Sequence, residues 1–124
     1  MKIQEAGENY LESIYILSKR QHEVRATDIC AYLGYSRPTV STVLKKFRED
    51  GYVTVDENNH ISLTELGLSI AEKMYERHIV ISKFLMALGV SEKNALEDAC
   101  KIEHDLSEET FFCIKEHYFQ HLAK

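Results

Sequence analysis

The sequence predicts a mainly α fold in which a winged helix-turn-helix is followed by a helical domain. Three observations predict it: two helical patterns joined by a Gly-containing turn, two short runs of β-favouring residues around a polar tip, and long helical patterns in the second half. We expect the first domain at residues 1–63 and the second at residues 64–124, because the second β run gives way to helix at that point.

The first half of the chain contains three expected helices. Apolar residues spaced three and four apart predict the first over residues 8–20. Thr27 and Asp28 are expected to cap a short helix that Gly34 ends, because glycine adopts left-handed backbone angles without penalty. Ser36 is expected to cap the next helix, whose second residue is a proline, which the first turn tolerates. The inner apolar stripe of this helix comprises Val40, Val43, Leu44 and Phe47.

A β-hairpin is expected next, at residues 52–63 with a polar tip at residues 56–59. A helix-turn-helix followed by such a hairpin defines a winged helix. Thr64 then caps a long helix, which Gly89 ends. The inner stripe of the long helix comprises Leu66, Ile70, Met74, His78, Ile81, Leu85 and Leu88.

Two further helices are expected after the long one. Ser91 caps a helix that reaches about Asp105, and Ser107 caps the last helix. The apolar surface of these helices exceeds what a lone winged helix needs, so we expect it to form a homodimer interface.

Composition narrows the class of protein. The 124 residues carry a net charge of −5, which argues against a generally basic nucleic-acid coat but not against a local basic patch. Three widely spaced cysteines form a poor disulfide framework and suit a reducing compartment. The N-terminal residues lack the apolar region of a signal peptide, and no stretch approaches the roughly 20 apolar residues that span a bilayer. We therefore expect a cytoplasmic protein with no membrane partner.

The second helix of the helix-turn-helix has an outer face suited to double-stranded DNA. Its small polar residues suit base edges, its proline suits a thymine methyl group, and its basic residues suit phosphates. The expected DNA-contacting residues are Arg37, Pro38, Thr39, Ser41, Thr42, Lys45 and Lys46. The alternative is an ordinary solvated face, which the winged-helix context disfavours. Asp56 and Glu57 at the hairpin tip would repel phosphate, and we expect His60 to be a free surface histidine.

Three helices each offer metal-ligating side chains. Cys100, Glu103 and His104 are spaced i, i+3 and i+4, which places them on one face of the helix expected to reach about Asp105. They supply a thiolate, a carboxylate and an imidazole, which suit a transition-metal ion. Asn9 and Glu12 are i, i+3 on the first helix, and His78 interrupts the apolar stripe of the long helix. Each residue alone also has an ordinary structural interpretation.

Several motifs resemble the diphtheria-toxin-repressor family of iron- or manganese-dependent repressors. The motifs are Asn9–Tyr15, Arg37–Ser41, Arg48–Val53, Arg77–His78 and Asp98–His104, in the same order as in the family and across essentially the whole chain. The resemblance implies a winged-helix domain, a helical dimerisation domain and palindromic operators of metal-uptake genes. It also implies a metal site between the first helix and the dimerisation domain. The implied ligands are Asn9, Glu12, His78, Cys100, Glu103 and His104.

The donor types set the expected metal. Iron-type members share the cysteine at Cys100 but usually have methionine in place of Asn9, whereas manganese-type members usually have aspartate and glutamate at these two positions. A thiolate favours softer ions than manganese, so we expect Fe(II) first, Mn(II) second and other divalent transition metals after them. Ser82 stands where iron-type members carry the carboxylate of an ancillary site, so that site is not expected. We expect His117 and His121 to be exposed histidines.

The expected function is that of a metal-dependent transcriptional repressor. Metal is expected to favour the arrangement that spaces two reading helices for half-sites about 34 Å apart. The first alternative is a winged-helix regulator that responds to a small organic ligand or to oxidation of Cys100. An enzyme is not expected, because a catalytic zinc site needs an open coordination position and a substrate cleft.

Overall fold

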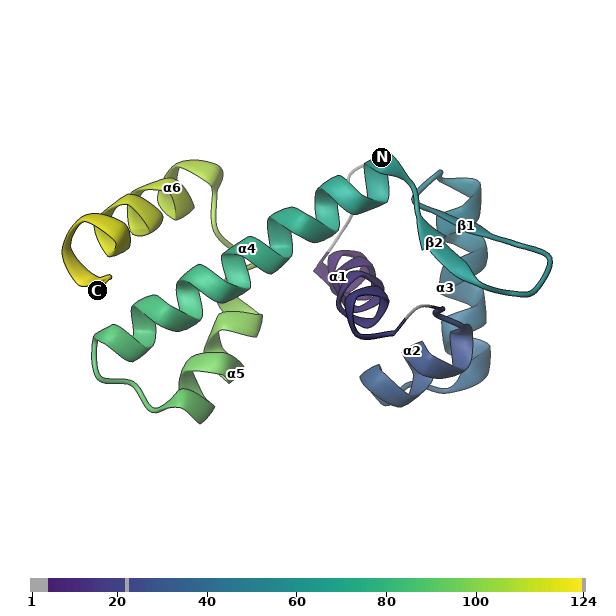
Figure 1. Ribbon diagram of the computed structural model, residues 1–124, viewed down its shortest axis with the longest axis horizontal. Helices are drawn as coiled ribbons and strands as arrows, with labels where there is room; N and C mark the ends of the chain where they lie inside the picture. Colours follow the sequence, from purple (N-terminus) through teal and green to yellow (C-terminus); the bar gives the residue numbers. More distant parts are fainter. Residues whose placement is uncertain (1–4, 22, 124) are drawn as a thin grey trace. The chain divides into compact units, whose positions relative to one another are not determined.

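The computed structural model describes residues 5–21 and 23–123, with the side chain of Glu5 excluded. The chain forms two compact units, one up to Glu72 and the other from Lys73 (Figure 1). The dividing point lies inside a helix, so each unit contains part of that helix. The domain boundary expected at residues 63 and 64 stays a prediction.

Three helices begin the N-terminal unit: α1 (Glu5–Arg20), α2 (Ala26–Leu33) and α3 (Arg37–Glu49). The prediction that Thr27 and Asp28 cap α2 is wrong, because the helix begins earlier and its N-cap is Arg25. Asp28 lies inside the first turn, where its Oδ2 accepts a hydrogen bond from the Arg25 backbone N at 2.8 Å. The carboxylate thus satisfies a backbone donor from within the helix rather than from in front of it.

The turn between α2 and α3 follows the sequence closely. Gly34 ends α2 with a φ of 75°, which only glycine adopts without strain. Ser36 caps α3, and its Oγ accepts from the Thr39 backbone N at 3.3 Å. Val40, Leu44 and Phe47 are buried and fix the outer face of α3 toward solvent.

The hairpin consists of β1 (Val53–Val55) and β2 (Ile61–Leu63), which pair antiparallel. The Ile61 backbone N donates to the carbonyl of Val24 at 2.7 Å and so joins β2 to the segment before α2. The core of this unit is formed by residues from all three helices, the hairpin and the start of α4. Its buried members are Tyr10, Leu11, Ile14, Leu17, Val24, Ile29, Val40, Leu44, Phe47, Tyr52, Val53, Ile61 and Ala71.

The long helix α4 (Glu65–Ala87) starts tightly against the hairpin. Thr64 caps it by accepting from the Gly67 backbone N at 3.2 Å, and the Thr64 hydroxyl donates to the Gly51 carbonyl at 2.6 Å. A Cβ atom on Gly67 would overlap the backbone carbonyl of Tyr52. Glycine at this position therefore permits the close approach of α4 to the hairpin.

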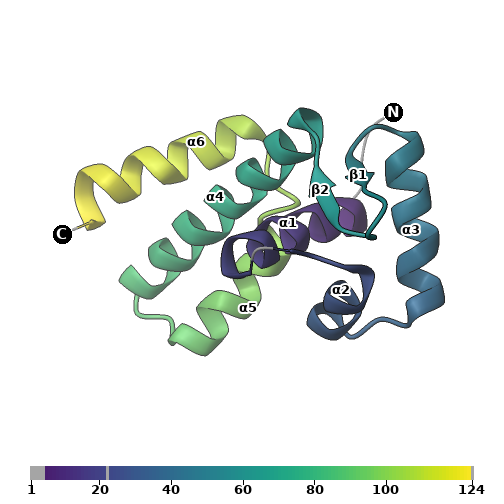
Figure 2. The same ribbon diagram turned by 45° about the vertical axis from the view of Figure 1, so that its right-hand side comes forward.

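The C-terminal unit packs α5 (Glu92–Ile102) and α6 (Glu108–His117) on either side of the second part of α4 (Figures 1 and 2). A π-helical turn, η1 (Tyr118–Leu122), follows α6. The core of this unit comprises Val80, Ile81, Ala99 and Phe111.

Two expectations for this half of the chain are wrong. The helix expected to reach Asp105 ends at Ile102, and residues 103–105 form a turn instead. Leu66 and Leu88, expected in the inner stripe of α4, are 52% and 61% exposed because they lie at the two ends of the helix. No helix in residues 5–21 and 23–123 is long and apolar enough to cross a bilayer.

Candidate functional site

The outer face of α3 is exposed along its whole length. All seven residues predicted to contact DNA are exposed: Arg37, Pro38, Thr39, Ser41, Thr42, Lys45 and Lys46. Val43, predicted in the inner stripe, is half-buried against the core. The amphipathic pattern of this helix thus places the polar residues where a duplex can reach them.

A groove of about 600 Å³ lies between α3, the beginning of α2 and the hairpin. Arg37, Ser41 and Lys45 line it from α3. Two further cations, Arg25 and Arg48, also line this groove and were not among the predicted DNA contacts. Arg48 was overlooked because it lies beyond the N-terminal part of the reading helix. The proximity of Arg25 depends on the tertiary fold.

The other predicted contact residues are partly engaged within α3. The hydroxyls of Thr39 and Ser36 are 2.8 Å apart, and the Thr42 hydroxyl donates to the Pro38 carbonyl at 2.9 Å. Lys46 Nζ lies 3.4 Å from Asp50 Oδ1. Arg37, Ser41 and Lys45 are thus the predicted contact residues that line the groove.

The expectation that His60 is a free surface histidine is wrong. Its Nδ1 lies 3.3 Å from Asp56 Oδ2, and its Nε2 lies 3.2 Å from Glu23 Oε2 and 3.0 Å from Arg25 Nη2. The backbone N of His60 also donates to Asp56, which lowers the pKa of that carboxyl. These contacts tie the loop end of the hairpin to the segment between α1 and α2.

The C-terminal unit brings together donors from α4, from α5 and from the turn after α5. His78 Nδ1 lies 3.7 Å from Cys100 Sγ and 3.3 Å from Glu103 Oε2. One ligand atom from each of these residues lies within 4.8 Å of the other two. Ligands that each sit about 2.0–2.3 Å from one transition-metal ion have this kind of separation, so the trio fits such an ion.

A turn after α5, and not a shared helical face, brings these residues together. Glu103 and His104 were expected on one helical face with Cys100, but the helix stops at Ile102. The turn that follows directs Glu103 into the protein, where it is 1% exposed. His104 Nε2 lies 3.3 Å from the other carboxylate oxygen, Oε1. The four predicted ligands of this unit therefore cluster around one buried carboxylate.

Arg77 holds that turn in place and was not predicted to have a role. It is 4% exposed, and its Nη1 donates to the carbonyls of Glu103 at 2.9 Å and Leu106 at 2.7 Å. Its guanidinium also lies 5.3 Å from the centre of the Phe111 ring. The available signal was an arginine beside His78 on the buried side of α4.

The electrostatics of the trio favour a charged imidazole when no metal is bound. The hydrogen bond with Cys100, followed by that with Glu103, raises the pKa of His78 to about 10. A metal ion must therefore displace a proton from His78.

Asn9 and Glu12 lie on α1 of the N-terminal unit, and their part in a ligand set stays a prediction. Ser82, at the position of the ancillary carboxylate, donates its hydroxyl to the His78 carbonyl at 2.6 Å. Its side chain is thus engaged within α4.

The fold and these two surfaces define the class: a winged-helix regulator with a transition-metal ligand cluster in its helical domain. The chain belongs to the iron-dependent repressor family. Residues 2–61 match "Iron dependent repressor, N-terminal DNA binding domain", and residues 64–120 match "Iron dependent repressor, metal binding and dimerisation domain". The family resemblance and the mainly α fold expected from the sequence are thereby confirmed.

Individual relatives agree with this assignment. The transcriptional regulator MntR of Escherichia coli O6:H1 is 36% identical over 117 residues, covering 94% of this chain and 76% of that protein. An uncharacterised HTH-type transcriptional regulator of Methanocaldococcus jannaschii is 38% identical over 104 residues, covering 82% and 83%. The structure of the manganese regulator SloR superposes with a TM-score of 0.79 at 29% identity, covering all of this chain and 56% of that one. The chain thus spans about half the length of this solved structure.

Proposed function

We propose that this chain is a metal-dependent transcriptional repressor that binds palindromic operator DNA as a homodimer when it carries a divalent transition metal, and thereby controls metal homeostasis. The observation that carries the proposal is the clustering of His78, Cys100 and Glu103 ligand atoms within 4.8 Å of one another. The basic groove beside α3 supplies the second half of the proposal.

The proposed ligand set adds Asn9, Glu12 and His104 to that trio. The two residues of α1, Asn9 and Glu12, are included because of the family resemblance. A bound ion supplies a positive charge that links these donors. Glu103 and the thiolate of Cys100 provide the opposing negative charge. The histidines bind as neutral imidazoles, so binding releases protons and weakens in acid.

The proposed ion is Fe(II), with Mn(II) as the second candidate. The Cys100 thiolate is softer than manganese prefers, and Asn9 offers only a neutral carbonyl oxygen. SloR is described as a manganese regulator, which keeps Mn(II) in consideration. Metal analysis of protein purified without oxygen decides between them: an iron-loaded sample supports Fe(II), and a manganese-loaded sample overturns that choice.

The proposed contacts to DNA divide by chemistry. We expect Ser41 to contact base edges, Arg37 to contact phosphate or guanine, and Lys45 and Arg25 to contact phosphates, since all four line the groove. Coupling between the two sites is reciprocal, so operator DNA must raise the affinity for metal by the factor by which metal raises the affinity for DNA.

The test uses the full-length chain and a randomised duplex library, selected with Fe(II) under anaerobic conditions. Wild-type protein is expected to enrich a palindrome and to bind it in a metal-dependent way. His104→Ala should lose that metal dependence, while its circular dichroism and its dimeric mass stay unchanged. Glu97→Gln, at an exposed position of α5, is the matched control. Metal-stimulated binding by the His104→Ala protein at wild-type strength would count against the site.

A further inference from the structure

A network of ionisable side chains joins the hairpin to the segment that precedes α2, and His60 lies at its centre. The Nε2 atom of His60 lies 3.0 Å from Arg25 Nη2 and 3.2 Å from Glu23 Oε2. Its Nδ1 atom lies 3.3 Å from Asp56 Oδ2. Arg25 lines the groove beside α3, whereas the other three residues line a separate cavity of about 450 Å³. His60 therefore connects a cation of the groove to two carboxylates of the second cavity.

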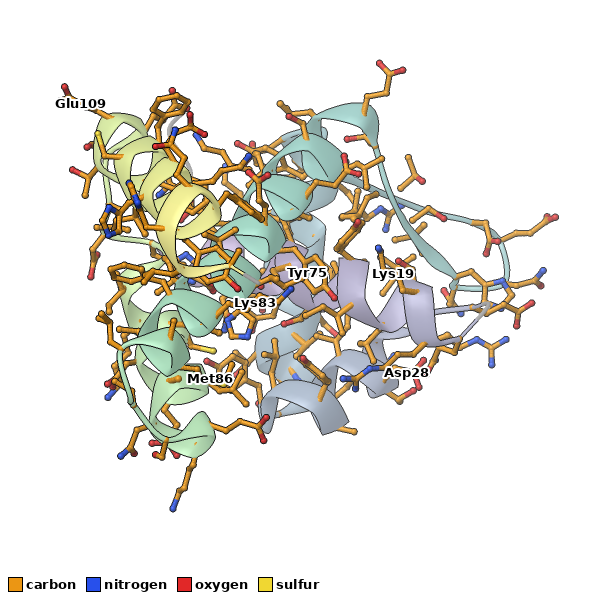
Figure 3. All side chains as sticks on the ribbon, turned by 60° about the vertical axis from the view of Figure 1, so that its left-hand side comes forward. Lys19, Asp28, Tyr75, Lys83, Met86 and Glu109 are labelled. Carbon is orange, nitrogen blue, oxygen red and sulfur yellow. The ribbon has the colours of Figure 1, made fainter. Side chains whose placement is uncertain are left out.

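Backbone hydrogen bonds fix the two segments that carry this network. The Ile61 backbone N donates to the Val24 carbonyl at 2.7 Å, so the residue after His60 is bound to the residue before Arg25. Asp28, labelled in Figure 3, lies in the first turn of α2 and accepts from the Arg25 backbone N at 2.8 Å. The side chains of His60 and Arg25 therefore meet from two anchored positions.

Asp56 selects the form of the ring that accepts a hydrogen bond from Arg25. The His60 backbone N donates to Asp56 Oδ1 at 2.9 Å, and this bond lowers the pKa of the carboxyl, which keeps it charged. A carboxylate beside Nδ1 favours a proton on that nitrogen, and the neutral ring then has its lone pair on Nε2. Nε2 is the atom that faces the Arg25 guanidinium, a group that only donates.

Glu23 competes with Arg25 for the same ring nitrogen. A neutral ring accepts from Arg25 through Nε2. A protonated ring instead donates from both nitrogens, so its Nε2 pairs with Glu23 while its positive charge repels Arg25. Histidine is the residue type whose charge changes near neutral pH, so the hydrogen bond to Arg25 is open to control by protons.

A neutral acceptor suits an arginine that has to bind phosphate. Arg25 is exposed, and a long exposed side chain loses conformational freedom when it binds. A hydrogen bond that already orders the guanidinium in the free protein reduces this loss. A neutral imidazole also leaves the positive charge of Arg25 available, whereas Lys46 is paired with the Asp50 carboxylate.

We propose that His60 is a positioning residue for DNA binding: its neutral ring orders Arg25 for contact with a phosphate, and protonation of the ring releases Arg25. This inference rests on the proposed function, in which Arg25 contacts phosphate. It gives DNA binding an acid sensitivity that arises in the N-terminal unit. That sensitivity is separate from the loss of metal in acid, which arises at the ligand cluster.

The first experiment examines the His60 ring in the free full-length chain and needs no DNA. NMR of isotope-labelled ring nitrogens at about pH 8 is expected to show a proton on Nδ1 and a lone pair on Nε2. His60→Gln identifies the signals by removing them, and Arg25→Ala should shift the Nε2 signal. A proton on Nε2 at this pH overturns the proposal, as does an Nε2 signal that Arg25→Ala leaves unchanged.

The second experiment is a double-mutant cycle on the affinity of the Fe(II)-loaded chain for a duplex of random sequence, measured by fluorescence anisotropy. Arg25→Ala should weaken binding about tenfold and His60→Ala about threefold. The double variant should bind no more weakly than Arg25→Ala alone. His60→Gln, whose amide oxygen can accept from Arg25, should restore most of the affinity. Ser62→Ala, at an exposed position of the hairpin, is the control and should bind as the wild type does.

The outcomes of this cycle separate positioning from support of the hairpin. Equal weakening by His60→Ala with and without Arg25 overturns the proposal, because the histidine would then act on the whole surface. Unchanged binding by Arg25→Ala also overturns it. A wild-type chain that binds no duplex refutes the proposed function instead, and the ring spectrum still decides whether His60 accepts from Arg25.

The third experiment follows the ratio of the wild-type affinity to the Arg25→Ala affinity as the pH is lowered. Both proteins carry the same metal ligands, so acid weakening of metal binding cancels in this ratio. The ratio should fall from about ten near pH 8 towards one near pH 5, the range in which histidine charges. In a His60→Gln background the same ratio should stay constant. A constant ratio in the wild-type background overturns the release of Arg25 by protonation.

Discussion

The DNA-facing surface and the ligand cluster are built in opposite ways. The surface belongs mostly to one regular helix, α3, whose spacing alone separates buried residues from exposed ones. The cluster takes His78 from α4, Cys100 from α5 and Glu103 from the turn after it. The regular helix presents its outer face once its buried stripe, Val40, Leu44 and Phe47, is packed. The turn at Glu103 instead needs Arg77 to satisfy its carbonyls. The reading surface should therefore tolerate substitution better than the scaffold of the irregular ligand site.

Replacement of Arg77 is expected to have the largest effect. Arg77→Met removes a buried guanidinium from two carbonyls, and hydrogen bonds from charged groups each contribute about 1.5–3 kcal/mol. We expect the free energy of unfolding of the C-terminal unit to fall by about 3 kcal/mol, measured by urea denaturation followed by circular dichroism. Arg77→Lys, which keeps the charge but replaces the guanidinium with a shorter-reaching ammonium, should have a stability between those of the wild type and Arg77→Met. A loss below about 1 kcal/mol would show that the turn is stable by itself.

The corresponding packing test in the N-terminal unit is Gly67→Ala. The added methyl group would overlap the Tyr52 carbonyl and force α4 away from the hairpin. Overpacking of this kind costs typically 1–3 kcal/mol, so we expect a loss of about 2 kcal/mol in the same denaturation experiment. Ser69→Ala, at an exposed position of α4, is the control and should change stability little. An unchanged Gly67→Ala protein would mean that the hairpin yields easily.

The stability of the metal-free protein should depend on pH through His78 of the ligand cluster. The pKa of His78 is raised from 6.5 to about 10, so its contribution to stability is fully present below about pH 6.5 and is lost as the pH rises through about 10. The free energy of unfolding should therefore decline over this range, and His78→Gln should reduce the decline. Denaturation at a series of pH values checks this. A decline of wild-type size in the variant would contradict it.

The smallest expected effect concerns two neighbouring lysines. Lys45 lines the groove, whereas Lys46 does not and forms an ion pair with Asp50. Lys45→Ala should weaken binding to all duplexes similarly and reduce the slope of log K against log salt by about 0.9. Lys46→Ala should leave that slope nearly unchanged. Fluorescence anisotropy at several salt concentrations measures both, and a sequence-dependent loss for Lys45→Ala would refute a phosphate contact.

The sequence predicted the regular parts of this molecule well. The cap at Ser36, the left-handed Gly34 and the exposed face of α3 all follow from local preferences. It failed where tertiary contacts decide the outcome. The end of α5 at Ile102 coincides with carbonyl groups held by Arg77, and no spacing pattern encodes that contact.

Contacts in the groove and in the hairpin were likewise not predictable from local sequence. The placement of Arg25 in the groove that Lys45 lines, and the contacts of His60 with carboxylates, both require residues distant in sequence. The candidate ligands were found because their chemistry is unusual on apolar helices. Their proximity through a turn was not predictable from helical spacing.

The guanidinium that holds the Glu103 turn has an evolutionary consequence. Because Arg77 anchors the backbone through two carbonyl groups, the shape of this region does not depend on which donor occupies the exposed position 100. A carboxylate in place of the exposed Cys100 thiolate should therefore need no compensating change in the hydrophobic interior. The metal preference of the site can then change with the donor at position 100 while the fold stays the same.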